Sequence, residues 1–233
     1  MTPARVGIIG SGRLARALVA RLPPGTDLVV LARRPLSAPL PRPAEVSTAP
    51  DVLAGVTVVV AAVPGEAVGD VIATAAPVLS AGTVVCNAAT DAATPPVAAR
   101  FPDLTVVGTK FIGQAGEIER GARGVVVVDG AAPEVLAELT ALFAGIGPVV
   151  AMDESAVLRI NTAVAEEMVR AVSAIRGRLA EVDVPPDVAT VALSTLAVGI
   201  LRSLADGTAG PFVRRIVDRL AAELPGGSSV LDE

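Results

Sequence analysis

Two glycines near the start of the chain are spaced as in a site that binds a diphosphate. The apolar run RVGII at residues 5–9 is followed at once by GSGRLA at residues 10–15. Gly10 permits a tight turn, Gly12 lets the backbone approach an anion, and Ala15 lets the next helix lie close to the strand. The free N–H groups at the start of that helix would hold the phosphates of a dinucleotide; a tight turn without a ligand is the alternative. The predicted cofactor-binding residues of this turn are Gly10, Ser11, Gly12, Arg13 and Leu14.

Two arginines indicate which dinucleotide would bind. An NAD site usually has an acidic residue at the end of the second strand, where it accepts hydrogen bonds from the ribose. Here the run Asp27–Leu31 ends in Ala32, Arg33 and Arg34, and its acid, Asp27, lies at the other end. Two guanidinium groups would hold a 2′-phosphate, although solvated loop arginines are the alternative. We therefore predict NADP(H) rather than NAD(H).

Lys110 is a candidate catalytic residue, because it is the only lysine among 19 basic residues. It follows the apolar run Leu104–Gly108, whose carboxyl end should face the cofactor crevice. Desolvation would lower its pKa and allow it to donate a proton, or it would pair with a substrate carboxylate; a solvated loop charge is the alternative. Thr109, beside it, is a candidate substrate contact.

Two asparagines and the single cysteine have less defined roles. Asn87 ends the run Thr83–Asn87 and is predicted to bind the cofactor, with turn formation equally compatible. Asn161 lies within a predicted long helix and is a second catalytic candidate, with a polar contact between domains as the alternative. Cys86 lies in an apolar run, which favours a buried structural thiol.

The residue types that are missing exclude several chemistries. The chain has no His, Tyr or Trp and one Cys, which excludes a Ser-His-Asp triad, a Tyr-Lys couple, an intramolecular disulfide and a Cys/His zinc site. We predict no metal. Reduction of a ketone needs a proton donor at once, whereas reduction of an iminium ion gives a neutral amine without a strong acid. The composition therefore favours C=N reduction, or hydride exchange with another cofactor.

Charge and hydropathy bear on partners and location. The net charge of −5 argues against nucleic acid as a partner. The longest uncharged stretch, Val71–Thr90, contains Pro77, Ser80 and Gly82 and predicts a helix, a turn and a strand rather than a membrane span. We expect a cytoplasmic protein without a membrane partner.

The elements that must position these residues alternate between strands and helices. Because the apolar runs are short and continuous, they predict strands buried on both faces. The expected fold class is α/β, a Rossmann-type doubly wound parallel sheet in residues 1–152. Its predicted strands are Arg5–Ile9, Asp27–Leu31, Val56–Ala62, Thr83–Asn87, Leu104–Gly108, Gly124–Asp129 and Pro148–Met152; its predicted helices are Arg13–Arg21, Pro64–Ala75, Asp91–Phe101 and Pro133–Ala144; and Arg34–Pro50 is predicted as a surface loop.

Residues 153–233 predict a small all-helical domain. Its expected helices are Asp153–Glu181, Pro185–Ala205 and Pro211–Leu224. The second is apolar nearly all round, so it should pack against the sheet domain or a second copy of the chain. We therefore expect a homodimer formed through these helices.

On these residues the chain resembles the pyrroline-5-carboxylate reductases and the deazaflavin-dependent NADP oxidoreductases. The likeness rests on VGIIGSGRLA at 6–15, ARR at 32–34, VAAVP at 60–64 and ALFAGIGPVV at 141–150. It implies that Ala62, Val63 and Pro64 line the ribose side of the cofactor. The run PGGSS at 225–229 is similar to the loop that holds the substrate carboxylate in those reductases, which makes Ser228 and Ser229 candidate substrate residues.

The expected activity is NADPH-dependent reduction of a small imine, in the manner of the pyrroline-5-carboxylate reductases. One alternative is an NADPH–deazaflavin oxidoreductase. The other is an NADP-binding sensor or partner protein without turnover, since a nucleotide fold does not by itself imply catalysis.

Overall fold

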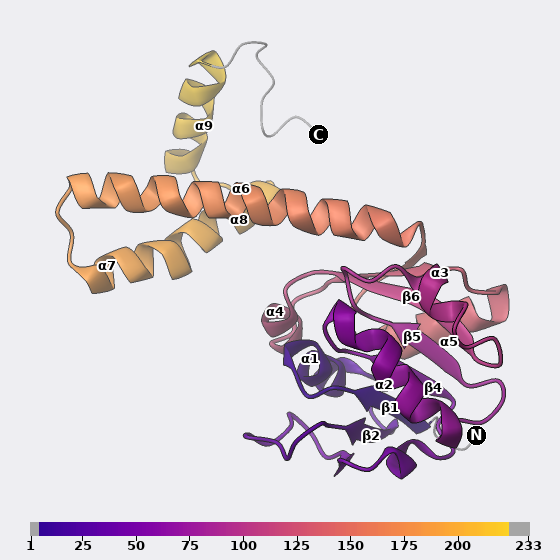
Figure 1. The fold of residues 1–233 in the computed structure, drawn as a ribbon. Helices are drawn as coiled ribbons and strands as arrows, with labels where there is room; N and C mark the ends of the chain where they lie inside the picture. Colours follow the sequence, from indigo (N-terminus) through magenta and orange to yellow (C-terminus); the bar gives the residue numbers. More distant parts are fainter. Residues whose placement is uncertain (1–4, 224–233) are drawn as a thin grey trace. The chain divides into compact units, whose positions relative to one another are not determined.

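The structure is a computed structural model that describes residues 5–223, and it comprises two compact units. The units divide between Ala163 and Val164, inside the long helix α6 (Glu154–Glu181). The first turns of α6 therefore belong to the first unit (Figure 1). The boundary expected at residue 152 coincides with the start of this helix.

The first unit is built on one eight-stranded sheet, ordered β3-β2-β1-β4-β5-β6-β7-β8. All neighbouring strands are parallel except β6 and β7, which are antiparallel. The order runs outward in both directions from β1 and β4, so the predicted doubly wound sheet is confirmed. The strands are β1 (Arg5–Ile9), β2 (Asp27–Leu31), β3 (Glu45–Ser47), β4 (Val58–Ala61), β5 (Val84–Asn87), β6 (Thr105–Ile112), β7 (Val125–Asp129) and β8 (Val149–Ala151).

Helices cover both faces of this sheet, and alternation along each strand decides which side chain meets which helix. On one face Ile8 and Val60 pack in a cluster with Leu18, Ile118 and Phe143. These come from α1 (Arg13–Arg21), α4 (Ala115–Glu119) and α5 (Pro133–Phe143). The opposite face packs on α2 (Val68–Ala75), on α3 (Thr94–Ala98) and its flanking residues, and on a 3₁₀ turn at Pro50–Leu53. This burial on two faces explains why the strands are apolar without a break.

The largest departure from the predicted elements is the length of β6. The expected strand Leu104–Gly108 extends to Ile112, because β7 pairs with it antiparallel from Gly108↔Asp129 to Ile112↔Val125. Lys110 and Thr109 therefore lie inside a strand, not in the loop after one. The edge strand β3 lies within the expected loop 34–50, the short helix α4 was not expected, and α3 is shorter than the predicted helix Asp91–Phe101.

The second unit holds the rest of α6 together with α7 (Pro186–Val191), a π-helical segment (Ala192–Ala197), α8 (Val198–Ala205) and α9 (Pro211–Glu223). The three predicted helical regions are thus present. Among the side chains described here, only Ala209 is buried. The stretch Pro186–Ala205 is also long and apolar enough to cross a membrane by length and composition, with mean hydropathy 1.8; a helix that packs in a soluble core can meet the same test.

Candidate functional site

The turn after β1 has the geometry that its glycines predict. Gly10 has φ +115°, a conformation that side chains rarely adopt, and a Cβ there would collide with the carbonyl oxygen of Ala62. Its N–H donates to the carbonyl of Leu31 at 2.8 Å, and the N–H of Ala62 donates to the carbonyl of Ile9 at 2.8 Å. The ends of β1, β2 and β4 are therefore held together at one point.

Gly12 marks the place where an anion would fit. It is the N-cap of α1, with ordinary extended backbone angles, and no side chain caps the helix. The first turn of α1 holds no acidic residue, and a Cβ on Gly12 would meet nothing within 4 Å. Open space therefore lies over uncapped N–H groups, which is the arrangement that binds the phosphates of a dinucleotide.

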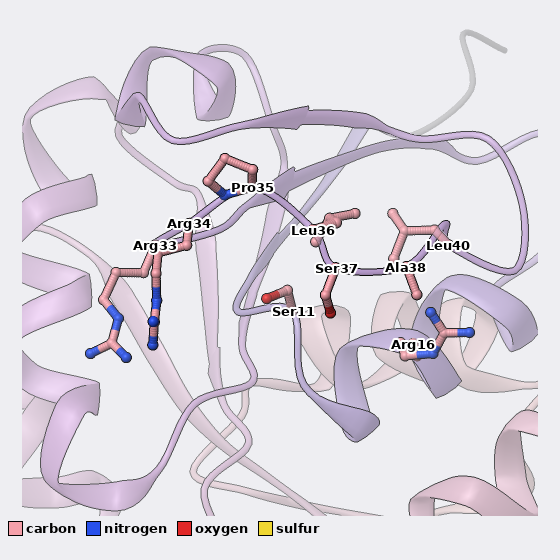
Figure 2. A pocket seen from close by; sticks show the side chains of 9 residues that line it. All are labelled: Ser11, Arg16, Arg33, Arg34, Pro35, Leu36, Ser37, Ala38 and Leu40. Atoms are coloured by element: carbon pink, nitrogen blue, oxygen red, sulfur yellow. The ribbon is translucent and has the colours of Figure 1, made fainter.

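A cavity of about 490 Å³, here called the arginine cavity, lies on one side of this turn. Figure 2 shows the side chains of Arg33 and Arg34 at one end of the view and Arg16 at the other, with the hydroxyls of Ser11 and Ser37 between them. The guanidinium groups of Arg33 and Arg34, with these two hydroxyls, form a donor set suited to a phosphate monoester. The remaining lining residues are Pro35, Leu36, Ala38 and Leu40.

Arg16 also fixes the loop that forms the outer wall of the arginine cavity. Its Nη1 donates to the carbonyl of Pro39 at 2.7 Å, and its Nη2 donates to Glu119 of α4 at 3.0 Å. Asp27, at the opposite end of β2, is paired with Arg5 at 2.8 Å. Among the described residues that line this cavity, none is acidic, whereas a carboxylate is what usually selects an unphosphorylated ribose.

A second cavity of about 460 Å³, the loop cavity, lies on the other side of the turn. Gly12, Arg13 and Leu14 line it, and Ala62, Val63 and Pro64 form the wall after β4. The rest of the lining comes from the loop after β5 and from the start of α4: Ala88, Ala89, Thr90, Asp91, Gln114 and Ala115. All but one of the predicted residues of the glycine turn and the β4 loop line one cavity or the other; Gly10 forms the turn itself.

Asn87 does not line the loop cavity, but its side chain holds the backbone of the loop after β5 that does. It is buried at the end of β5, where its Nδ2 donates to the carbonyl of Ala92 and to Thr94 Oγ1, each at 2.9 Å. Its Oδ1 accepts from the N–H of Ala89 at 3.2 Å. The turn-forming alternative for Asn87 is therefore the one that the geometry supports.

Lys110 is buried, with 1% of its surface exposed. Its Nζ donates to the carbonyls of Ala89 at 2.5 Å and Ala92 at 2.9 Å, and it lies 3.3 Å from Glu154 Oε2. Burial lowers the pKa of Lys110, while the negative charges of Glu154 and Asp91 oppose that shift. The solvated loop charge considered from the sequence is wrong, because β7 extends β6 past this residue.

Glu154, the first residue of α6, completes a buried network. Its Oε1 accepts from the N–H of Thr94 at 2.5 Å, and its Oε2 accepts from Thr94 Oγ1 at 2.6 Å. We call Asn87, Thr94, Lys110 and Glu154 the buried network. It joins the loop after β5, strand β6 and the first turn of α6 within one unit.

Two further predicted residues of the described structure, Thr109 and Asn161, line neither cavity. Thr109 is fully buried in β6 and lines neither, so its predicted substrate contact is not supported; the cause is again the extension of β6. Asn161 Nδ2 donates to the carbonyl of Phe111 at 3.1 Å. Cys86 is buried, as predicted, and Ser228 and Ser229 lie outside the described residues.

Sequence reasoning missed three groups of residues near the site. These are the lining residues of the loop after β5, the start of α4 with Gln114, and Glu154. Of these residues, only Glu154 could have been anticipated from the sequence, because a buried Lys110 requires a carboxylate as its counter-ion. Glu154 lies 44 positions after Lys110 in the chain, and the sequence contains many other carboxylates, so the sequence alone does not identify which of them is the partner.

Comparison with known proteins was made at the level of sequence and of structure. Neither a protein-family model nor a curated protein sequence matches this chain. Among solved structures, a pyrroline-5-carboxylate reductase from Coxiella burnetii superposes with a TM-score of 0.68 at 16% identity, over 97% of this chain and 87% of that one. The chain has the fold of the pyrroline-5-carboxylate reductases.

Two further structures agree with this fold. Plasmodium falciparum pyrroline carboxylate reductase, solved with NADP bound, gives a TM-score of 0.63 at 11% identity over 99% of this chain and 87% of that one. A variant imine reductase from Myxococcus stipitatus, in complex with NAD⁺, gives a TM-score of 0.55 at 17% identity over 88% of this chain and 75% of that one. The resemblance seen in the sequence motifs therefore extends to the architecture.

Proposed function

We propose that this protein is an NADPH-dependent oxidoreductase that reduces a small C=N substrate. The observation that carries the proposal is the pair of cavities on either side of the glycine turn, one of them lined by three arginines. The arginine cavity fits an adenosine 2′-phosphate, and the open space over Gly12 fits a diphosphate. The loop cavity is then left for the nicotinamide half and the substrate.

The residues of the loop cavity support the choice of substrate class. Arg13 and Asp91 are the ionisable side chains that line it in the described structure. A bound NADPH would supply a hydride there. The chain has neither His nor Tyr to donate a proton, whereas an iminium carbon that accepts a hydride becomes a neutral amine. The similar folds of pyrroline-5-carboxylate reductases and an imine reductase support the same class.

We also propose that the protein is a cytoplasmic homodimer joined through the second unit. The apolar helical surface of that unit supports this assembly, because the described helices of the unit do not cover it among themselves. The stretch Pro186–Ala205 would then pack against the partner rather than cross a membrane.

Titration with NADPH and NADH tests the cofactor assignment. Because the chain has no Trp or Tyr, the emission of bound NADPH can be followed without interference from the protein. We expect Arg33→Ala/Arg34→Ala to weaken NADPH binding by a factor on the order of 100, since hydrogen bonds to charged groups contribute about 1.5–3 kcal/mol each. NADH binding should change less than threefold.

The double variant Arg120→Ala/Arg123→Ala is the matched control, because both residues are exposed arginines of the same unit outside the arginine cavity. It should bind NADPH as the unmodified protein does. Equal loss of NADPH and NADH in the Arg33/Arg34 variant would contradict the 2′-phosphate assignment. Oxidation of bound NADPH by cyclic imines supports the substrate class. Oxidation by a deazaflavin alone, or by no acceptor, would replace it with one of the two alternatives.

A further inference from the structure

We propose that Lys110 and Glu154 form a positioning pair that holds residues 88–92 in the shape needed to receive the nicotinamide half of the cofactor. The inference rests on the proposed function. It assigns Lys110 a role other than proton donation, and it gives Glu154 a role that its sequence position at a helix start does not suggest.

The contacts of Lys110 support this role. Its ammonium group has three N–H donors, and the structure gives it three acceptors: the carbonyls of Ala89 and Ala92 and the carboxylate of Glu154. Two of these acceptors belong to the backbone of the loop that lines the loop cavity. With every donor engaged inside the protein, Lys110 has no N–H left for a substrate.

Glu154 is held as firmly as its partner. Both of its carboxylate oxygens accept from Thr94, which begins α3 directly after the loop. Gly108 of β6 provides the space, since a Cβ there would lie 2.5 Å from Glu154 Oε2 and 3.2 Å from Thr94 Oγ1. The loop is thus fixed at Ala89 and Ala92 by Lys110 and at its end by Glu154.

Stability alone does not account for such a pair. Removing two charges from water is costly, and a buried ion pair often contributes no more than a well-packed apolar pair would. An apolar pair could not satisfy the loop carbonyls, however, and unpaired buried carbonyls are costly in turn. The pair therefore serves to define one path of the backbone between β5 and α3.

The consequence at the cavity concerns Thr90 and Asp91. They lie between the two carbonyls that Lys110 holds, and both line the loop cavity. Asp91 carries the carboxylate of that lining, and a Cβ on Gly65 would lie 2.5 Å from its Oδ1. A shift of residues 88–92 would move the Asp91 carboxylate against the loop after β4, which contains Gly65.

The test measures two ligands on one variant. Lys110→Met/Glu154→Gln removes both charges together, so neither is left buried without a partner. Adenosine 2′,5′-bisphosphate would reach the arginine cavity and the glycine turn but not residues 88–92, whereas NADPH would extend along the loop cavity to those residues. We expect binding of the bisphosphate to stay within twofold and binding of NADPH to weaken at least tenfold. Arg170→Met/Glu167→Gln, the same exchange at an exposed ion pair of α6, should alter neither.

A second variant keeps the test decisive if the first fails to fold. Gly108→Ala leaves every charge in place and displaces the Glu154 carboxylate, so it should reproduce the selective loss of NADPH affinity. The proposal is overturned if either folded variant binds NADPH as the unmodified protein does. It is equally overturned if Lys110→Met/Glu154→Gln binds NADPH normally and loses only the alkaline limb of its pH–rate profile, which would make Lys110 a proton donor. Failure of the unmodified protein to bind NADPH or the bisphosphate would instead refute the proposed function itself.

Discussion

The two units of this chain are both rich in aliphatic residues, yet only the first buries them. Strands β1, β2, β4 and β5 lie between two layers of helices, and most of their side chains are inaccessible to solvent. In the second unit, only Ala209 is buried among the residues that the structure describes. A sheet covered on both faces buries its side chains within one chain, whereas the helices described in the second unit leave most of their apolar side chains accessible.

The exposed apolar side chains of the second unit follow a helical pattern. Along α6, Val164, Met168 and Val172 of the second unit recur at intervals of four residues, which places them on one stripe, and Ile160 continues that stripe into the first unit. Further large exposed apolar residues lie on the helices that follow: Val188, Val191, Leu196, Val198, Leu201, Phe212 and Leu220. A repeated stripe of this kind is typical of a helix that packs against another layer.

The largest effect is expected when charge is placed on this stripe. Val164→Glu/Val172→Glu should convert the proposed homodimer to monomers. Each valine withdrawn from an interface forfeits about 2 kcal/mol, and each carboxylate left there is strongly disfavoured. The dissociation constant should rise by a factor on the order of 1,000 or more, which sedimentation velocity would reveal.

The control for this variant lies in the first unit. Val46→Glu/Val150→Glu makes the same exchange at exposed positions of the edge strands β3 and β8, and it should leave the mass in solution unchanged. If the unmodified protein sediments as a monomer, the second unit must be covered in another way and the comparison between the units fails.

Substitutions at two glycines of the first unit should distinguish an effect on stability from an effect on cofactor binding. A Cβ on Gly12 meets nothing within 4 Å, so we expect Gly12→Val to keep the melting temperature within a few degrees and, by occupying the space of the diphosphate, to weaken NADPH binding by a factor on the order of 100. Gly10 combines φ +115° with a collision at Ala62, so Gly10→Val should lower the free energy of unfolding by about 3 kcal/mol or more. Thermal melts alongside NADPH titrations check both. Loss of fold in the Gly12 variant would show that this side of the turn is packed rather than open.

Cys86 is not part of either cavity, and its reactivity reports on the folding of the first unit alone. Burial raises the pKa of its thiol from 9.0 to about 12. At pH 8 its alkylation by iodoacetamide should therefore be slower in the native protein than in urea by a factor on the order of 1,000. Mass spectrometry measures the rate. The Val164→Glu/Val172→Glu variant should keep this protection if the first unit folds without help from the second.

The same thiol gives a pH dependence with a defined sign. Because its folded pKa is the higher one, its contribution to stability is complete below pH 9 and is lost as the pH rises from 9 towards 12. The slope expected from this group is about 1.4 kcal/mol per pH unit. Urea unfolding of Cys86→Ala should lack that slope, and an identical slope in both proteins would contradict the assignment.

Local pattern was sufficient for much of the fold. The bounds of β1, β2 and α1 agree with prediction residue for residue, since a buried parallel strand and the helix after a glycine turn carry strong local signals. The bounds of β6 differ from the prediction, because its extension to Ile112 depends on an antiparallel partner, β7, that begins at Val125. The short helix α4 and edge strand β3 have too few residues for a periodic signal.

The sequence by itself determined the alternation of buried strands and helices that predicts a doubly wound sheet, the glycine turn and the two arginines after β2, because each of these signals comes from residues that are neighbours in the chain. Only the tertiary structure decided the surroundings of Lys110. Its acceptors come from the loop after β5 and from the start of α6, and whether a lysine is solvated or buried depends on which distant groups the fold brings within hydrogen-bonding distance.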